Sequence, residues 1–159
     1  MKDRAKRASS SQNTLKAVLY PLLVALEVAG AVTILWHGVP IYRSFLAEQS
    51  IQPADAAVVA WAIAGITLIQ APYWFSTLRV FRSQAIPRYI FAGHAVLFLA
   101  RLNFVFVSGL FAAVVFVRGA EIEFVPWRAA MLAAVLFSMF CFSLELERLG
   151  KALARDASL

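Results

Sequence analysis

Four long apolar stretches constrain this chain more than any other feature. They cover residues 15–36, 54–78, 89–117 and 126–146 of the 159-residue sequence. A helix needs about 20 mostly apolar residues to cross the ~30 Å hydrocarbon core of a bilayer, and each stretch meets that length. Hydrophobic residues make up 62% of the chain, above the roughly 45–50% that is usual in globular proteins. The sequence therefore predicts an all-α membrane protein, a four-transmembrane-helix bundle.

Positive charge alternates from one connection to the next along the chain. The N-terminal segment, the connection at 79–88 and the C-terminal segment are basic, and the other two connections mix both signs. The basic residues are Lys2, Arg4, Lys6, Arg7, Lys16, Arg79, Arg82, Arg88, Arg148, Lys151 and Arg155. Because cytoplasmic connections carry an excess of Lys and Arg, both termini are expected in the cytoplasm. This pattern predicts a multi-pass protein of a plasma membrane of the bacterial inner-membrane type.

The basic segments also bear on partners. Lys and Arg next to a membrane attract anionic lipid headgroups by about 1 kcal/mol per residue. We expect Arg79, Arg82 and Arg88 to fix the topology and to contact such headgroups. No interleaving of aromatic and basic residues supports nucleic acid as a partner, and none is expected.

Three segments are expected from the distribution of charge. Residues 1–14 are predicted to be a basic flexible tail, and residues 15–147 to form the transmembrane domain. Residues 148–159 are predicted to be a short cytoplasmic extension of the last helix. Around the start of this segment, Glu145, Glu147 and Arg148 are expected on a solvated helix face. The first apolar stretch runs on to Trp36 and carries Glu27, so we expect a membrane helix there and not a cleaved signal peptide.

Two charged residues interrupt the apolar stretches at matching positions. Glu27 lies 12 residues after Leu15, and Arg101 lies 12 residues after Tyr89. At about 1.5 Å per residue, both are expected about 18 Å from the cytoplasmic boundary. Charged groups inside a membrane usually pair with one another. Equal depth therefore predicts an ion pair between Glu27 and Arg101, joining the first and third spans.

Further polar residues extend this pair into a predicted polar seam that faces the bundle interior. Tyr20 and His94 each lie seven residues before one of the two charges, close to two helical turns, and so share its face. The full seam comprises Tyr20, Glu27, Gln70, His94, Arg101 and Asn103. Two roles stay open for it. It either fixes helix register as a buried ion pair, or it forms a path for protons or substrate.

Pro72 interrupts the second apolar stretch. A proline inside a helix removes one backbone hydrogen bond and usually kinks the helix. Either a structural kink or a gating hinge is consistent with this position.

Motifs of enzymes and cofactor sites are missing from the sequence. It contains no GxSxG, HExxH or P-loop pattern. The two histidines, His37 and His94, are expected about 25 Å apart in depth at ~1.5 Å per residue, too far to ligate one haem. The single cysteine, Cys141, is expected to pack as a small apolar residue. We therefore expect no catalytic residues, no metal site and no cofactor.

Three classes of function remain. The favoured one is a non-enzymatic accessory or assembly subunit, or an oligomeric scaffold, acting as a homo-oligomer or within a larger membrane complex. The second is a small proton-linked transporter or channel that uses the polar seam. The third is a membrane enzyme acting on lipid or quinone. The identity of substrate or partner does not follow from the sequence.

Overall fold

The computed structural model of the chain describes residues 2–47, 56–78, 89–118 and 125–154. Its regular structure in these ranges is entirely α-helical: α1 spans Lys2–Leu46, α2 Ala56–Leu78, α3 Ile90–Arg118 and α4 Pro126–Ala154. Each of the four helices is long and apolar enough to cross a membrane. The prediction of an all-α chain with four such helices is confirmed.

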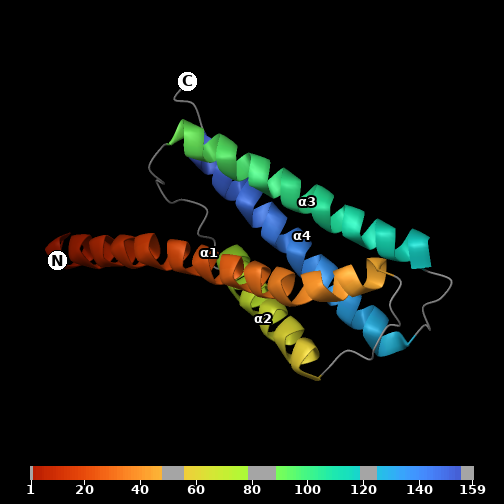
Figure 1. The fold of residues 1–159 in the computed structure, drawn as a ribbon. Helices are drawn as coiled ribbons and strands as arrows, with labels where there is room; N and C mark the ends of the chain where they lie inside the picture. The colour runs from red at the N-terminus through yellow and green to blue at the C-terminus, as the bar shows by residue number, and fades with distance from the viewer. Residues whose placement is uncertain (1, 48–55, 79–88, 119–124, 155–159) are drawn as a thin grey trace.

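The helices form two antiparallel pairs, α1 with α2 and α3 with α4 (Figure 1). α4 joins the pairs, because it also packs against α2 and α1. Within the ranges just given, α3 contacts neither α1 nor α2. One end of the bundle is where α1 and α3 begin and where α2 and α4 end, and we call it the Arg148 end.

Glycines allow the two helices of each pair to approach closely. A Cβ atom on Gly30 of α1 would lie 2.8 Å from the backbone oxygen of Gly65 on α2. A Cβ on Gly65 would lie 2.6 Å from Ile34 Cγ1. In the other pair, a Cβ on Gly93 would lie 2.6 Å from the backbone nitrogen of Ala154. Small residues at helix contacts are a common device in membranes, where close packing holds helices together.

The buried core is small and lies where α1, α2 and α4 meet. It is built from Ala31, Ile69, Met139 and Phe142. Most large apolar side chains point outward instead, and α3 carries many of them, with Phe91 89% exposed. An outward apolar surface of this kind suits helices surrounded by lipid.

The ends of α1 and α4 bear on the expected segments. α1 begins at Lys2 and includes residues 2–14, whose Ala, Lys, Arg and Gln favour helix, and the flexibility of this segment stays a prediction. α4 continues past residue 146 to Ala154, in the direction of the expected helical extension. Residues 155–159 of the predicted extension lie outside the described residues, as do Arg79, Arg82 and Arg88.

Candidate functional site

Glu27 is buried in α1 without a partner. Its residue is 1% exposed, and neither carboxylate oxygen has a hydrogen-bond partner among the described residues. Arg101 is exposed on α3, a helix that does not contact α1. The predicted ion pair between Glu27 and Arg101 is therefore wrong, and the seam does not hold all of its six members together.

The prediction failed because, among the described helices, α3 packs on α4 alone and does not reach α1. Asn103 Nδ2 donates to Ser143 Oγ of α4 at 2.8 Å, so Arg101 lies near the charged end of α4, within electrostatic range of Glu147. His94 lies seven residues nearer the start of α3 than Arg101, and it is exposed as well. Both residues lie away from the α1, α2 and α4 contact.

Asn103 belongs to the contact between α3 and α4. Its amide also donates to the backbone oxygen of Met139 at 3.3 Å, while Ser143 Oγ donates to that same oxygen at 3.1 Å. Because α4 is the helix that α3 packs on, these bonds help to hold α3 in place.

Replacing Asn103 by Val is expected to lower the free energy of unfolding by about 1 kcal/mol, the scale of interhelical hydrogen bonds in membranes. The loss stays modest because Ser143 keeps its own bond to Met139. Denaturation by sodium dodecyl sulfate in mixed micelles measures it. The control is Ser108→Ala, a change at an exposed position of the same helix. An effect of Asn103→Val no larger than that of the control would show that the amide does not hold α3.

A polar layer, built around Gln70 of α2, links α2 to α4. Gln70 Nε2 donates to Ser138 Oγ at 3.1 Å and lies 3.7 Å from Cys141 Sγ. Its Oε1 accepts a bond from Trp74 Nε1 at 2.8 Å. Ser138 Oγ in turn donates to the backbone oxygen of Ala134 at 2.7 Å. These groups satisfy one another and leave Glu27 without a bond.

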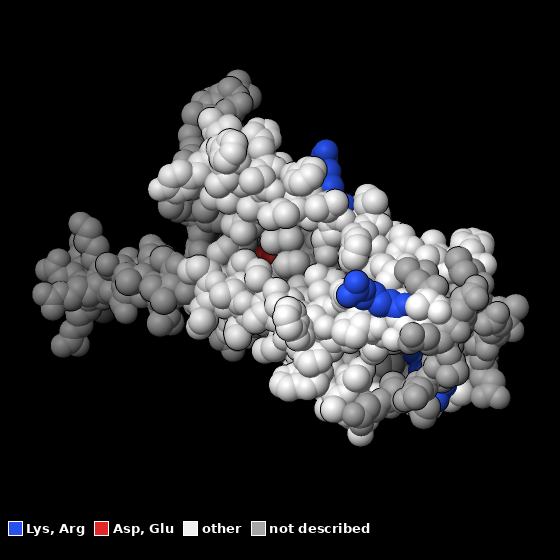
Figure 2. Space-filling view, viewed as in Figure 1, with Lys and Arg blue, Asp and Glu red and all other residues white. Residues whose placement is uncertain are grey.

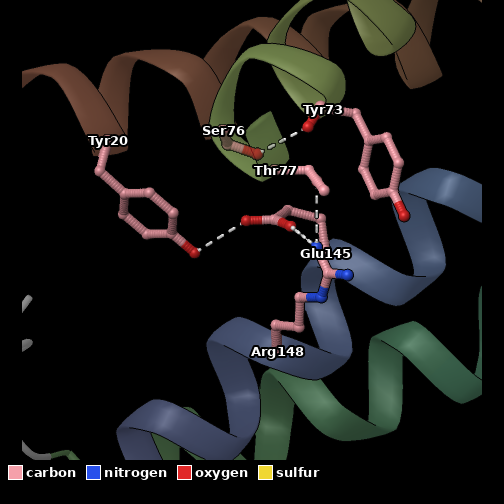
Figure 3. A network of polar contacts seen from close by, with 6 residues as sticks. All are labelled: Tyr20, Tyr73, Ser76, Thr77, Glu145 and Arg148. Atoms are coloured by element: carbon pink, nitrogen blue, oxygen red, sulfur yellow. Dashed lines mark hydrogen bonds and ion pairs between the residues drawn. The ribbon is translucent and has the colours of Figure 1, made fainter. Parts of the chain in front are cut away.

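A second polar layer lies nearer the Arg148 end and centres on Glu145 (Figure 3). The residue is 5% exposed. Tyr20 of α1 donates its hydroxyl to Glu145 Oε1 at 3.1 Å. Arg148 Nη1 lies 3.3 Å from Glu145 Oε2 and 3.3 Å from Thr77 Oγ1 of α2. The guanidinium carbon also lies 5.5 Å from the centre of the Tyr73 ring. This layer ties three helices together.

Glu145 is buried, so the prediction that it lies on a solvated face is wrong. Glu145 lies seven residues after Ser138 and four after Cys141, which are both buried. Residues at these spacings share one face of a helix. The periodicity of α4 could therefore have indicated its burial, whereas its charged neighbours Glu147 and Arg148 pointed the other way.

Pro72 is buried within α2, and the helix continues through it. Next to it, Ser76 Oγ donates to the backbone oxygen of Tyr73 at 2.9 Å. A hinge at Pro72 stays a prediction.

Charge in this site is unbalanced. Glu27 lies within electrostatic range of Glu145 and Arg148, and Arg148 pairs with Glu145 at 3.3 Å. One guanidinium thus lies near two buried carboxyl groups and bonds one of them. Among the residues with described positions, no three His, Cys, Asp or Glu side chains gather around a point that could hold a metal ion. On the face shown in Figure 2, acidic atoms reach the surface as one small spot on the floor of a hollow.

The comparisons with known proteins add no relative to these observations. The chain matches no protein-family model, no curated protein and no solved structure.

Proposed function

We propose that this chain is a small proton-linked membrane transporter in which Glu27 takes up and releases a proton. The observation that carries this proposal is the buried carboxyl of Glu27, which lies in an apolar helix without a hydrogen-bond partner. An ionised carboxylate in such a place costs several kcal/mol unless a positive charge joins it. A proton supplies that charge and needs the least room.

The missing hydrogen bonds of Glu27 argue against a purely structural role for this residue. Buried polar side chains that fix a fold are normally hydrogen-bonded. Gln70 and Ser138 bond to each other instead. Ionisable residues inside membrane helices commonly mark paths for ions or protons, and an unsatisfied one beside a second buried acid fits that use.

The orientation in the membrane is part of the same proposal. Arg148 and Lys151 lie near the end of α4, and the basic segment before Leu15 begins α1 at the same end (Figure 1). Membrane proteins carry an excess of Lys and Arg on their cytoplasmic side. This rule supports placing the Arg148 end on the cytoplasmic side of a plasma membrane.

The accessory-subunit, scaffold and enzyme functions stay predictions. No contact among the described residues favours any of them. Association with a second copy or with a larger complex stays one too. Transport through Glu27 is compatible with either state of assembly.

Proton flux into liposomes tests the proposal. The purified protein is reconstituted around a pH-sensitive dye, and a potassium diffusion potential drives protons inward. We expect wild-type protein to acidify the lumen at least about ten times faster than protein-free liposomes, a ratio worth ~1.4 kcal/mol. Glu27→Gln keeps the shape of the side chain but not its exchangeable carboxyl proton. This variant is expected to reduce the flux to background.

The matched control is Glu147→Gln, the same change at a residue that pairs with Lys151 at 2.6 Å on an exposed part of α4. It is expected to keep the wild-type flux. The proposal fails if wild-type protein acidifies the lumen no faster than empty liposomes, or if Glu27→Gln retains the wild-type rate.

A further inference from the structure

We propose that Glu145 is a second proton-carrying group and that Tyr20 passes protons between it and Glu27. The two residues would form the route from Glu27 to the Arg148 end of the bundle. This inference rests on the proposed function, because it describes how protons reach the same site.

The position of Tyr20 carries the argument. Its hydroxyl donates to Glu145 Oε1 at 3.1 Å, and it lies on α1 seven residues before Glu27, on the same helix face. Tyr20 interacts electrostatically with both carboxylates. A phenol hydroxyl can accept one hydrogen bond while it donates another, so Tyr20 is chemically able to pass a proton on.

The directions of the helices bring the two acids toward each other. α1 and α4 run antiparallel, and side chains on a helix lean toward the N-terminal end of that helix. Glu27 on α1 therefore leans toward the Arg148 end, and Glu145 on α4 leans away from it. The seven-residue separation of Tyr20 and Glu27 corresponds to about 10 Å along the axis. A rotation of the Glu27 side chain, or a water molecule, has to close the remaining gap.

Arg148 connects Glu145 to the outside. Its Nη1 donates to Glu145 Oε2 at 3.3 Å, a charge-assisted hydrogen bond. The Arg148 side chain is 51% exposed, whereas that of Glu145 is 6% exposed. The arginine thus joins the buried acid to the surface of the bundle end.

The transfer is balanced in protons and charge. The O–H bond of Glu27 breaks and its proton binds the oxygen of Tyr20, while the original Tyr20 proton moves to Glu145 Oε1. Tyr20 ends neutral, Glu27 ends as a carboxylate and Glu145 ends as a carboxylic acid. The negative charge has then moved from Glu145 to Glu27, and the proton leaves Glu145 past Arg148.

Other ionisable groups surround this route on each packed element. The groups near Glu145 or its neighbours are Tyr20 and Glu27 from α1, Tyr73 from α2, and Cys141 and Arg148 from α4, with Arg101 of α3 within electrostatic range of Glu147. Tyr73 contacts Arg148 through its ring. Tyr20 is therefore, among these groups, the hydroxyl that bonds one carboxylate and shares a helix face with the other.

Two conservative variants test the route in the full chain. Tyr20→Phe removes one oxygen, and Glu145→Gln keeps an oxygen that can accept the Tyr20 bond. We expect each to lower proton flux at least about ten-fold. The matched controls are Tyr89→Phe, at a residue that is 63% exposed, and Glu147→Gln, which is expected to keep its flux.

Infrared difference spectra between acid and alkaline pH separate a lost route from a lost site. In Tyr20→Phe, the carboxylic-acid band that disappears in Glu27→Gln is expected to remain, because Glu27 still binds its proton. Wild-type flux in both Tyr20→Phe and Glu145→Gln, with Glu27→Gln silent, would overturn the route and leave the proposed function standing. Wild-type flux in Glu27→Gln would overturn the proposed function itself. Loss of the Glu27 band in Tyr20→Phe would assign Tyr20 a structural role and also overturn the route.

Discussion

Replacing Glu27 by Met is expected to make the protein more stable while abolishing proton flux. Met is unbranched like Glu and adapts to irregular apolar surroundings. The wild-type residue is 1% exposed and its carboxyl is unpartnered in the described structure. Burial of a polar group without a hydrogen bond costs about 1–3 kcal/mol in mutational data, and Met removes that cost.

Denaturation by sodium dodecyl sulfate in mixed micelles measures this gain. We expect Glu27→Met to raise the free energy of unfolding by roughly 1–3 kcal/mol. Glu27→Gln is expected to fall between wild type and Met, since it stays polar but carries no charge. Glu145→Met serves as the comparison. It removes the bonds to Tyr20 and Arg148, so it should destabilise the fold. A Glu27→Met protein less stable than wild type would show that the carboxyl holds the helices together.

The expected opposition between stability and flux follows from what a transport site needs. A group that must bind and release a proton cannot be permanently satisfied by its neighbours. Proteins commonly retain such unfavourable groups at functional sites and lose function when these are replaced for stability. Glu27 meets that description, whereas Gln70 and Ser138 beside it are mutually bonded.

Replacing Gly65 by Leu is expected to separate α1 from α2 and to prevent folding. Even a Cβ atom at this position would lie 2.6 Å from Ile34 Cγ1 and 3.1 Å from the backbone oxygen of Gly30. A side chain end can move, but a backbone oxygen moves only with its helix. We expect a loss of about 3 kcal/mol or more, at the upper end of overpacking effects.

The yield of monodisperse protein in detergent, followed by denaturation of whatever folds, measures that loss. Gly109→Leu is the matched control, because nothing lies within 4 Å of a Cβ atom at Gly109. The control should fold normally and gain slightly from the removal of a helical glycine. Equal yields of the two variants would contradict the close approach of α1 and α2 at Gly65.

The length of the four apolar stretches was enough to predict the fold class. In lipid, every backbone N–H and C=O group needs a hydrogen bond within the protein, and an α-helix provides these bonds within each span. The candidate site was predictable only in part. Glu27 was singled out by its charge within an apolar stretch, but its pairing was inferred from depth, and depth depends on where each helix leaves the membrane. α3 begins at Ile90 yet packs its first turns on the charged end of α4. No local pattern in the sequence fixes that register.

Glu145 shows the complementary difficulty. Its neighbours Glu147 and Arg148 are charged, and a run of charges usually marks a solvated surface. Its spacing from Ser138 and Cys141 places Glu145 on their face of α4, and the contact of α4 with α1 and α2 buries that face. Contacts between distant segments, such as Tyr20 with Glu145, depend on how helices are arranged around the bundle. A single sequence contains little information about that arrangement.

The place of α4 in the bundle bears on how the protein is made. Chains are synthesised from the N-terminus, and early segments can fold before later ones exist. α1 and α2 pack directly against each other at Gly30 and Gly65, so they are able to pair before α3 and α4 have been synthesised. α3 has no such neighbour among the described helices that precede it. α3 has no packing partner until α4 emerges, and the same helix brings Ser138 to Gln70 and Glu145 to Tyr20. α4, the last of the four described helices in chain order, therefore completes the packing and brings in the second buried acid.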